Sequence, residues 1–452
     1  MAGTERFVWQ KLRRHFGTDD LTSLVSSRRE FTAHLLPDLQ SVIEDQLEPW
    51  SPELFGFYQK YEINRMKLSD LTISKDDAVW LAPVQRQDID IGEDKPYASL
   101  NNGLWLIRVD DGIHVAIMLS KFLTDYGPQV QIEIGHLPCE QGQAFAKRFM
   151  HAVQAKGTRS RYYRGKAVSL EFSGPCRGTA ETMRVHKLPA VSRDNLVLSK
   201  ATMDQLERHI FDFVRYREEL KRLGQSGRKG ILLHGHPGTG KTHIIHHIAA
   251  NLPDHTTILV TAEQMLNIGE YFALARILQP CVLVLEDVDL VGRSRENISG
   301  LKAETRLNRL LNEVDGLGTD GDIFTIMTTN RVDALEEALA LRSGRVDVSL
   351  EIPLPDDDCR ERLIKAYGHV LNFQGEALAE VVSRSNGGSA AYVKEMVRRL
   401  VQQNIALGGS LVISREDVVA VFADAEPVIN PLKRNEEMVR IHILEEDDCG
   451  CC

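Results

Sequence analysis

Short apolar runs alternate with amphipathic stretches through the middle of the chain. Residues 231–233, 257–260, 282–285 and 323–328 are each short and apolar or β-branched, as in buried strands. Segments with helical periodicity separate these runs. This alternation predicts an α/β fold in which a parallel sheet is covered by helices on both faces.

The first 190 residues have a different pattern, which mixes strands and helices. Residues 103–110 and 113–119 are predicted to form a hairpin, because Asp-Asp-Gly at 110–112 is a turn sequence. We also expect strands at 129–134 and 167–172 and helices at 35–47 and 141–154. All four tryptophans lie in the first quarter of the chain. The sequence therefore predicts a separate α+β domain over 1–190, in which no catalytic motif is found.

From residue 356 to about residue 423 the pattern becomes wholly helical. The predicted division is a domain at 1–190, a large α/β subdomain at 191–355, a helical lid at 356–425 and an acidic tail at 426–452. The tail ends in Cys-Gly-Cys-Cys. Such a tail is typical of disorder, while metal capture, a reactive end or prenylation at the terminal Cys-Cys stay open.

Length, charge and cysteine content narrow the class of protein. A chain of 452 residues is too long for one core, and its 43% hydrophobic and 26% charged residues fit a globular protein. The net charge of −10 disfavours nucleic-acid binding, which usually needs a basic face. No apolar run approaches the roughly 18–20 residues of a membrane span. Scattered cysteines do not form a disulfide framework, so we expect a cytoplasmic protein.

A glycine-rich loop follows the first strand of the α/β pattern and opens a helix. Residues 235–242 read Gly-His-Pro-Gly-Thr-Gly-Lys-Thr and satisfy the phosphate-binding pattern G-x-x-x-x-G-K-[ST] in the required context. The glycines let backbone N–H groups turn toward phosphates, and Lys241 adds a positive charge. Thr242 offers a hydroxyl to Mg²⁺. The loop predicts ATP binding by Gly235, His236, Pro237, Gly238, Thr239, Gly240, Lys241 and Thr242.

Two acids end a later apolar strand. Residues 281–285 are followed by Glu286 and Asp287, at the strand end where open α/β sheets bind their ligands. We predict that Glu286 holds Mg²⁺ and that Asp287 orients or deprotonates the attacking water. Asp289 is interpreted as structural. Three histidines after the loop, His243, His246 and His247, could seat zinc by spacing but are interpreted as ordinary helix residues.

These motifs resemble the AAA family of the AAA+ superfamily over about residues 196–407. The resemblance implies a P-loop NTPase sheet with a small C-terminal helical lid. Residues 328–330 look like the sensor-1 element of that family, which implies that Asn330 contacts the γ-phosphate or the lytic water. Residues 387–391 resemble its lid motif, which implies that Ala390 and Ala391 touch adenine and ribose.

The same resemblance implies that the site is completed between subunits. Residues 341–345, Leu-Arg-Ser-Gly-Arg, are similar to the arginine-finger segment of the AAA family. Arg342 and Arg345 would then reach the nucleotide of a neighbouring subunit and stabilise the charge that spreads over the γ-phosphoryl group. A homo-oligomeric ring, a hexamer or similar, is therefore expected.

The order of the two acids departs from most AAA proteins. Glu286-Asp287 replaces the usual Asp-Glu, which places the base one methylene closer to the backbone and predicts slow hydrolysis. This order resembles the AAA family that includes the mitochondrial inner-membrane translocase of the Rieske iron–sulfur protein. Met-Thr-Thr-Asn at 327–330 and Gly-Arg-Val-Asp at 344–347 share that resemblance, whereas no membrane anchor is found.

The sequence leads to two hypotheses about function. In the first, a ring-forming ATPase remodels, unfolds or translocates a protein substrate that residues 1–190 select. In the alternative, nucleotide gates the assembly of a scaffold and turnover is slow. Threading ATPases usually carry an aromatic–hydrophobic pair in the loop after the second strand. Tyr271 and Phe272 are the aromatic pair in this region, and we interpret them as core residues of the next helix.

Overall fold

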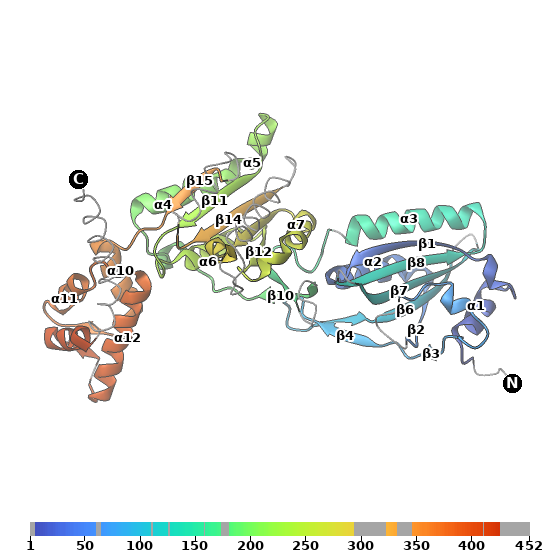
Figure 1. Ribbon diagram of the computed structural model, residues 1–452, viewed down its shortest axis with the longest axis horizontal. Coiled ribbons are helices and arrows are strands. Elements are labelled where there is room, and N and C mark those ends of the chain that lie inside the picture. Colours follow the sequence, from blue (N-terminus) through green and yellow to red (C-terminus); the bar gives the residue numbers. More distant parts are fainter. Residues whose placement is uncertain are drawn as a thin grey trace, which may run out of the picture. The chain divides into compact units, whose positions relative to one another are not determined.

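The computed structural model describes residues 5–59, 65–109, 112–124, 127–157, 159–172, 180–292, 322–331, 346–409 and 411–424. Figure 1 shows the helices and strands of the chain. Contacts divide the chain into two compact units. The first unit comprises Met1–Pro189, Gly224–Gly230 and Asn251–Met327, and the second comprises Ala190–Leu223, Ile231–Ala250 and Thr328–Cys452.

A six-stranded antiparallel sheet occupies the N-terminal part of the first unit. Its strand order is β1 (Val25–Thr32), β8 (Gly127–His136), β7 (His114–Thr124), β6 (Asn102–Arg108), β2 (Glu53–Phe57) and β3 (Leu81–Ala82). A separate antiparallel pair joins β4 (Arg86–Ile89) to β5 (Tyr97–Leu100). β6 and β7 pair with Trp105 opposite Ile117, so the predicted hairpin is confirmed. β1 was not predicted, because its polar sequence stays exposed along most of its length and lacks an apolar alternation.

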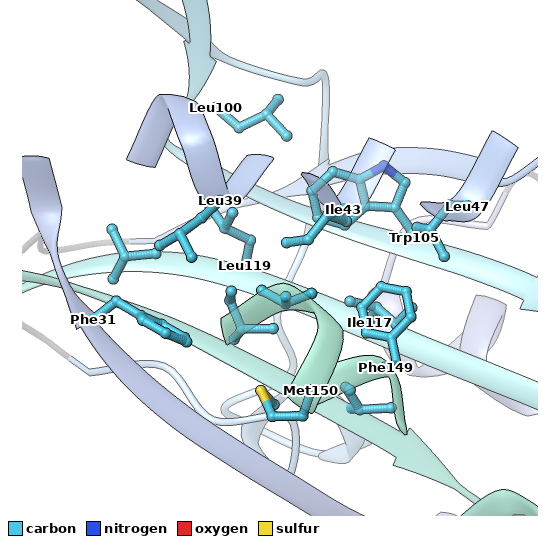
Figure 2. Close-up of a cluster of buried hydrophobic side chains, with 14 of the residues drawn as sticks. Phe31, Leu39, Ile43, Leu47, Leu100, Trp105, Ile117, Leu119, Phe149 and Met150 are labelled. Atoms are coloured by element: carbon cyan, nitrogen blue, oxygen red, sulfur yellow. The ribbon is translucent and has the colours of Figure 1, made fainter. Parts of the chain in front are cut away.

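Side chains alternate between the two faces of this sheet and build a core on each face. Trp105 and Ile117 face helices α2 (Leu36–Leu47) and α3 (Glu140–Gly157), and Figure 2 shows this cluster with Leu39, Ile43 and Phe149 from the helices. Neighbouring strand residues such as Leu104 and Met118 pack on the other face with α1 (Val8–Phe16). Both predicted helices of this region are confirmed.

A second sheet carries the strands that the apolar runs predicted. Its order is β10 (Ala180–His186), β9 (Ala167–Phe172), β12 (Thr256–Val260), β13 (Cys281–Leu285), β14 (Ile323–Thr329), β11 (Lys229–His234) and β15 (Val348–Glu351). The pairs β9–β12, β12–β13, β13–β14 and β11–β15 are parallel, and β10–β9 is antiparallel. The predicted α/β class is therefore confirmed. β9 and β10 precede residue 190, so this sheet also uses two strands from the stretch assigned to the first domain.

One group of helices lies between the strands of the second sheet in the sequence, and a second group after β15 forms a small bundle. The first group is α4 (Lys200–Leu206), a π-helical turn (Glu207–Phe211), α5 (Asp212–Arg222), α6 (Lys241–Asn251) and α7 (Ile268–Ile277). The bundle is α10 (Asp357–Tyr367), α11 (Ala377–Arg384), α12 (Ala390–Ala406) and a helical stretch at 415–424, with the short parallel pair β16 (Asn372–Phe373) and β17 (Val412–Ile413). Leu363, Val381 and Val397 are buried in its core.

Short 3-10 turns join several of these elements, at Leu21–Ser23, Ala33–Leu35, Glu48–Trp50, Asp70–Thr72, Arg193–Asn195, Gln264–Asn267 and Val288–Gly292. Tyr271 and Phe272 are fully buried in α7, which confirms their interpretation as core residues. Across the described part of the chain, no helix combines the length and apolar character that crossing a membrane requires.

Candidate functional site

The glycine-rich loop leaves the buried strand β11 and turns sharply into α6. Gly235, Gly238 and Gly240 have φ angles of 148°, 77° and 103°, which residues with a side chain rarely adopt. A Cβ on Gly235 would also lie 2.3 Å from the carbonyl oxygen of Ile352. Each glycine is therefore required by the path of the backbone, which forms the narrow turn that a phosphate group needs.

Lys241 is the first residue of α6, and its ammonium group lies within the curve of the loop. Its Nζ donates hydrogen bonds to the carbonyl oxygens of Gly235 at 2.7 Å and His236 at 3.0 Å, and the residue is 7% exposed. Thr242 follows with an exposed side chain. A buried cation, a turn built from glycines and the N-terminus of a helix together fit the phosphates of ATP.

Replacing Gly235 with alanine is expected to destabilise the protein by about 1–3 kcal/mol, because the positive φ and the contact with a backbone oxygen both resist a Cβ. Thermal unfolding would measure the change as a lower Tm. Gly269→Ala is the matched control, because Gly269 lies in α7 with nothing within 4 Å of its added Cβ. Equal Tm changes in both variants would contradict the structural requirement at Gly235.

The lid motif contacts the glycine-rich loop. The N–H of Ala391 donates a hydrogen bond of 3.0 Å to the carbonyl oxygen of Gly238. Ser389 caps α12 by accepting a hydrogen bond from the N–H of Tyr392, which fixes the start of that helix. A Cβ on Gly238 would lie 2.9 Å from the Cβ of Ala391. The structure thus brings Ala390 and Ala391 to the same loop as Lys241.

The three histidines of α6 make separate contacts. Nδ1 of His247 lies 2.9 Å from the carbonyl oxygen of Val191, and Nε2 of His243 lies 3.4 Å from that of Asn195. Burial, and then the nearby His243, lower the pKa of His246. Among the residues that the structure describes, the potential metal-ligand grouping is elsewhere, at Asp356, Asp358 and Cys359. These contacts agree with the interpretation of the histidines as ordinary helix residues.

The two predicted acids follow β13 in the first unit. The N–H of Glu286 donates to the carbonyl oxygen of Val260 at 2.9 Å, which extends the pairing of β12 and β13 by one residue. Asp287 then adopts a left-handed conformation with φ of 51°, and its carbonyl oxygen accepts from the N–H of Leu290. Aspartate tolerates this conformation better than most residues. Both acidic residues are half-buried.

A cavity of about 560 Å³ adjoins Glu286 within the first unit. It is lined by Ser169, Leu170, Glu171, Arg184, His186, Leu259, Thr261, Gln264 and Glu286. Sequence reasoning did not predict the five residues from β9 and β10. The available signal was the run of polar residues at alternate positions 182, 184 and 186, which indicates one polar strand face.

Asn330 directly follows β14, whose last residues Thr328 and Thr329 are buried. The side-chain oxygen of Thr329 accepts a hydrogen bond from the N–H of Arg331, so the backbone turns at Asn330. Asn330, the glycine-rich loop and the lid motif belong to the second unit, whereas Glu286 and Asp287 belong to the first. Arg342 and Arg345 lie outside the described residues.

Comparison with known proteins agrees with this geometry. Residues 231–354 match a family model described as "ATPase family associated with various cellular activities (AAA)". These residues run from β11, before the glycine-rich loop, past β15, which ends at Glu351. The match therefore includes the loop, both acids and Asn330.

Curated relatives extend the similarity beyond these residues. The chain is 29% identical over 226 residues to 26S proteasome regulatory subunit 8 homolog B of Arabidopsis thaliana, covering 47% of this chain and 54% of the relative. It is 34% identical over 196 residues to 26S proteasome regulatory subunit 8 of Caenorhabditis elegans, covering 40% and 47%. For 26S proteasome regulatory subunit 10B of Dictyostelium discoideum, identity is 35% over 188 residues, covering 39% and 47%.

The chain spans about half the length of these relatives, so the similarity concerns one region of each protein. The family match at 231–354 contains the glycine-rich loop with Lys241 and the acids after β13. Residues 231–354 of the chain are therefore similar to the family of ATPases described as AAA.

Proposed function

We propose that the protein is a ring-forming ATPase that couples ATP hydrolysis to the remodelling, unfolding or translocation of a protein substrate. The observation that carries this proposal is the loop at 235–242, in which a buried Lys241 lies in a turn whose backbone favours glycine at 235, 238 and 240. The relatives support the protein substrate, because they are named as regulatory subunits of the 26S proteasome.

Nucleotide binding is assigned to the loop and the lid together. Backbone N–H groups of 235–242 would hold the phosphates, and the Lys241 ammonium group would exchange its two carbonyl partners for phosphate oxygens. Ala390 and Ala391 would line the adenine and ribose side. The hydrogen bond from Ala391 to Gly238 supports this assignment, because it ties the lid to the loop.

Hydrolysis is assigned to the two acids and Asn330. Glu286 and the hydroxyl of Thr242 would hold Mg²⁺, which when bound neutralises phosphate charge and orients the phosphates. Asp287 would accept a proton from the attacking water, and Asn330 would hold that water or the γ-phosphate in place. The left-handed backbone at Asp287 supports a special role, because such conformations cluster at functional sites.

Ring formation rests on the arginine pair. Arg342 and Arg345 would complete the site of a neighbouring copy, as the resemblance of 341–345 to an arginine-finger segment implies. The word "subunit" in the names of the relatives supports an assembly. We propose a homo-oligomer, a hexamer or similar, in the cytoplasm, with residues 1–190 as the domain that selects the substrate.

Arg345→Ala is expected to lower ATP turnover at least about tenfold, because an arginine supplied in trans stabilises the transition-state charge. Mixing this variant with Lys241→Ala should restore part of the turnover. In mixed rings, a Lys241→Ala copy still offers its arginine to a neighbour whose own loop is intact. A mixture that stays as inactive as each variant alone, although the copies co-assemble on size exclusion, would contradict an arginine acting in trans.

The alternative function is a nucleotide-gated assembly switch with slow turnover. Asp287, Tyr271 and Phe272 support this alternative. Asp287 is one methylene shorter than the usual glutamate base, and this acid order resembles the Rieske-protein translocase type. Tyr271 and Phe272 are buried, so they are not available as a threading pair. ATP turnover of the purified full-length protein, measured with and without a protein client, distinguishes the two functions. Turnover that rises with an unfolded or tagged protein client supports the motor. Slow turnover that no client changes, together with ATP-dependent assembly, supports the switch.

A further inference from the structure

The β9–β10 hairpin brings charged side chains from the first 190 residues to the strand end that carries Glu286. β9 is parallel to β12, with Ala167 opposite Thr257, so continuing this register places Glu171 beside Thr261. Val260 of β12 is opposite Leu285 of β13, which places Thr261 beside Glu286. Because neighbouring strands are about 4.8 Å apart, the Cα atoms of Glu171 and Glu286 are roughly 10 Å apart.

Within the 560 Å³ cavity, Glu171 is paired with a cation from the other strand of the hairpin. Nη1 of Arg184 lies 3.6 Å from Oε1 of Glu171, and the two side chains are 62% and 48% exposed. An exposed pair of this kind contributes little to folding stability. Either charge can therefore be removed by a single substitution with little expected loss of folding stability.

Both charges act on a neighbouring group in the same cavity. Burial lowers the pKa of His186, Arg184 lowers it further, and Glu171 opposes the shift. Nε2 of His186 lies 2.8 Å from Oγ of Ser169, which holds the ring at the cavity wall. The hairpin therefore presents one positive and one negative charge to the space beside Glu286, and His186 reports on both.

The hairpin is fixed to the sheet and also connected to the N-terminal domain. The hydroxyl of Tyr271 in α7 lies 3.3 Å from both the N–H and the carbonyl oxygen of Leu170. On the other side, the Asp38 carboxylate of α2 accepts hydrogen bonds from Oγ of Ser160 at 2.7 Å and from the N–H of Arg161 at 2.6 Å. The short segment between Arg161 and β9 thus joins the first sheet to the cavity.

We propose that Glu171 and Arg184 are positioning residues of the Mg²⁺ site. The opposite charges of these two residues set the affinity of Glu286 for Mg²⁺, and their strands make this affinity depend on the N-terminal domain. This inference rests on the proposed role of Glu286. The two charges are exposed, and a separation of roughly 10 Å exceeds the Debye length of about 8 Å at 0.15 M salt, so we expect a modest effect on a divalent ion that grows at low ionic strength. Displacement of the hairpin by a client bound to the N-terminal domain would therefore change metal affinity.

Two single substitutions should move Mg²⁺ affinity in opposite directions. Glu171→Gln leaves Arg184 unopposed and should raise the Mg²⁺ concentration for half-saturation about two- to fivefold. Arg184→Gln leaves two carboxylates in one cavity and should lower it by a similar factor. The double variant should return close to the parent value, and added salt should shrink both effects.

The measurement uses the full chain with a non-hydrolysable ATP analogue and Mn²⁺, whose free concentration is read by electron paramagnetic resonance. Turnover at varied Mg²⁺ gives a second readout. Asp45→Asn and Arg161→Gln provide matched controls, because this exposed ion pair of 3.8 Å joins α2 to the segment after α3 and does not line the cavity. Both controls should leave the half-saturating concentration unchanged.

A nuclear magnetic resonance titration of His186 checks that the charges act in the folded variants. Glu171→Gln should lower the pKa of His186 further, and Arg184→Gln should raise it toward its ordinary value. Unchanged metal affinity in both variants, or a shift in the same direction in both, would overturn the inference. If the parent protein itself fails to bind Mn²⁺ with the nucleotide, the proposed function fails instead.

Discussion

Replacing Lys241 with alanine is expected to lower ATP turnover about 10²–10³-fold and to weaken nucleotide binding, because the loop loses its one buried cation. In the structure, this ammonium group donates hydrogen bonds to the carbonyl oxygens of Gly235 and His236 in the loop. On nucleotide binding it would exchange these two partners for phosphate oxygens. Phosphate release and fluorescent-nucleotide titration would measure the two effects.

Lys365→Ala is the matched control for this experiment. Lys365 lies in α10, is exposed and pairs with Glu361, so the substitution removes the same charge from the surface of the lid. Its turnover should match that of the parent protein. If Lys241→Ala retained parental turnover and affinity, the glycine-rich loop would not be the phosphate site and the central proposal would fail.

The central strands of the second sheet could be predicted from sequence because burial dictates their composition. Residues of β13 are all buried, so the strand reads as the uninterrupted apolar run Cys-Val-Leu-Val-Leu. The same reasoning located β12 and β14. In the first sheet, β6 and β7 contain nearly continuous apolar runs because each face has its own core, and the turn residues marked the hairpin.

The joining of β9 and β10 to the second sheet could not be predicted from local pattern. β9 was recognised as a strand, but its partner β12 lies far along the chain, and the register of Ala167 with Thr257 depends on tertiary packing. Contacts such as that of the Tyr271 hydroxyl with Leu170 fix this pairing. A single sequence contains no signal for contacts of this range. The division of the chain at residue 190 stays a prediction for the same reason.

Some residues of the candidate site could likewise be predicted from the sequence, and others could not. The residues of the loop are contiguous, so their spacing alone identified them, and their positive φ angles agree with the glycines at 235, 238 and 240. Ala390 and Ala391 were assigned by family resemblance, and their contact with Gly238 emerged from the fold. The charged wall of the cavity beside Glu286 was missed, because Glu171 and Arg184 meet through strand pairing.

The left-handed backbone at Asp287 decides which substitution gives a clean test of the base. Alanine at φ of 51° would add backbone strain to the loss of the carboxylate. Asparagine tolerates this conformation and keeps the shape of the side chain, while it removes the negative charge and the ability to accept a proton. Asp287→Asn therefore separates the chemical role of the residue from its structural one.

Asp287→Asn is expected to bind ATP with parental affinity and to hydrolyse it about 10²–10⁴-fold more slowly, because the general base is lost and the loop with Lys241 is untouched. A ring locked with ATP should keep its client, which mass spectrometry after affinity capture would identify.

Asp289→Asn is the matched control: the residue is two positions away in the same turn, carries the same charge and should retain parental turnover. Asp287→Asn with parental turnover would exclude the residue as the base. Loss of ATP binding as complete as in Lys241→Ala would instead assign it to nucleotide binding, since a residue that acts only on the attacking water cannot reduce affinity to that extent.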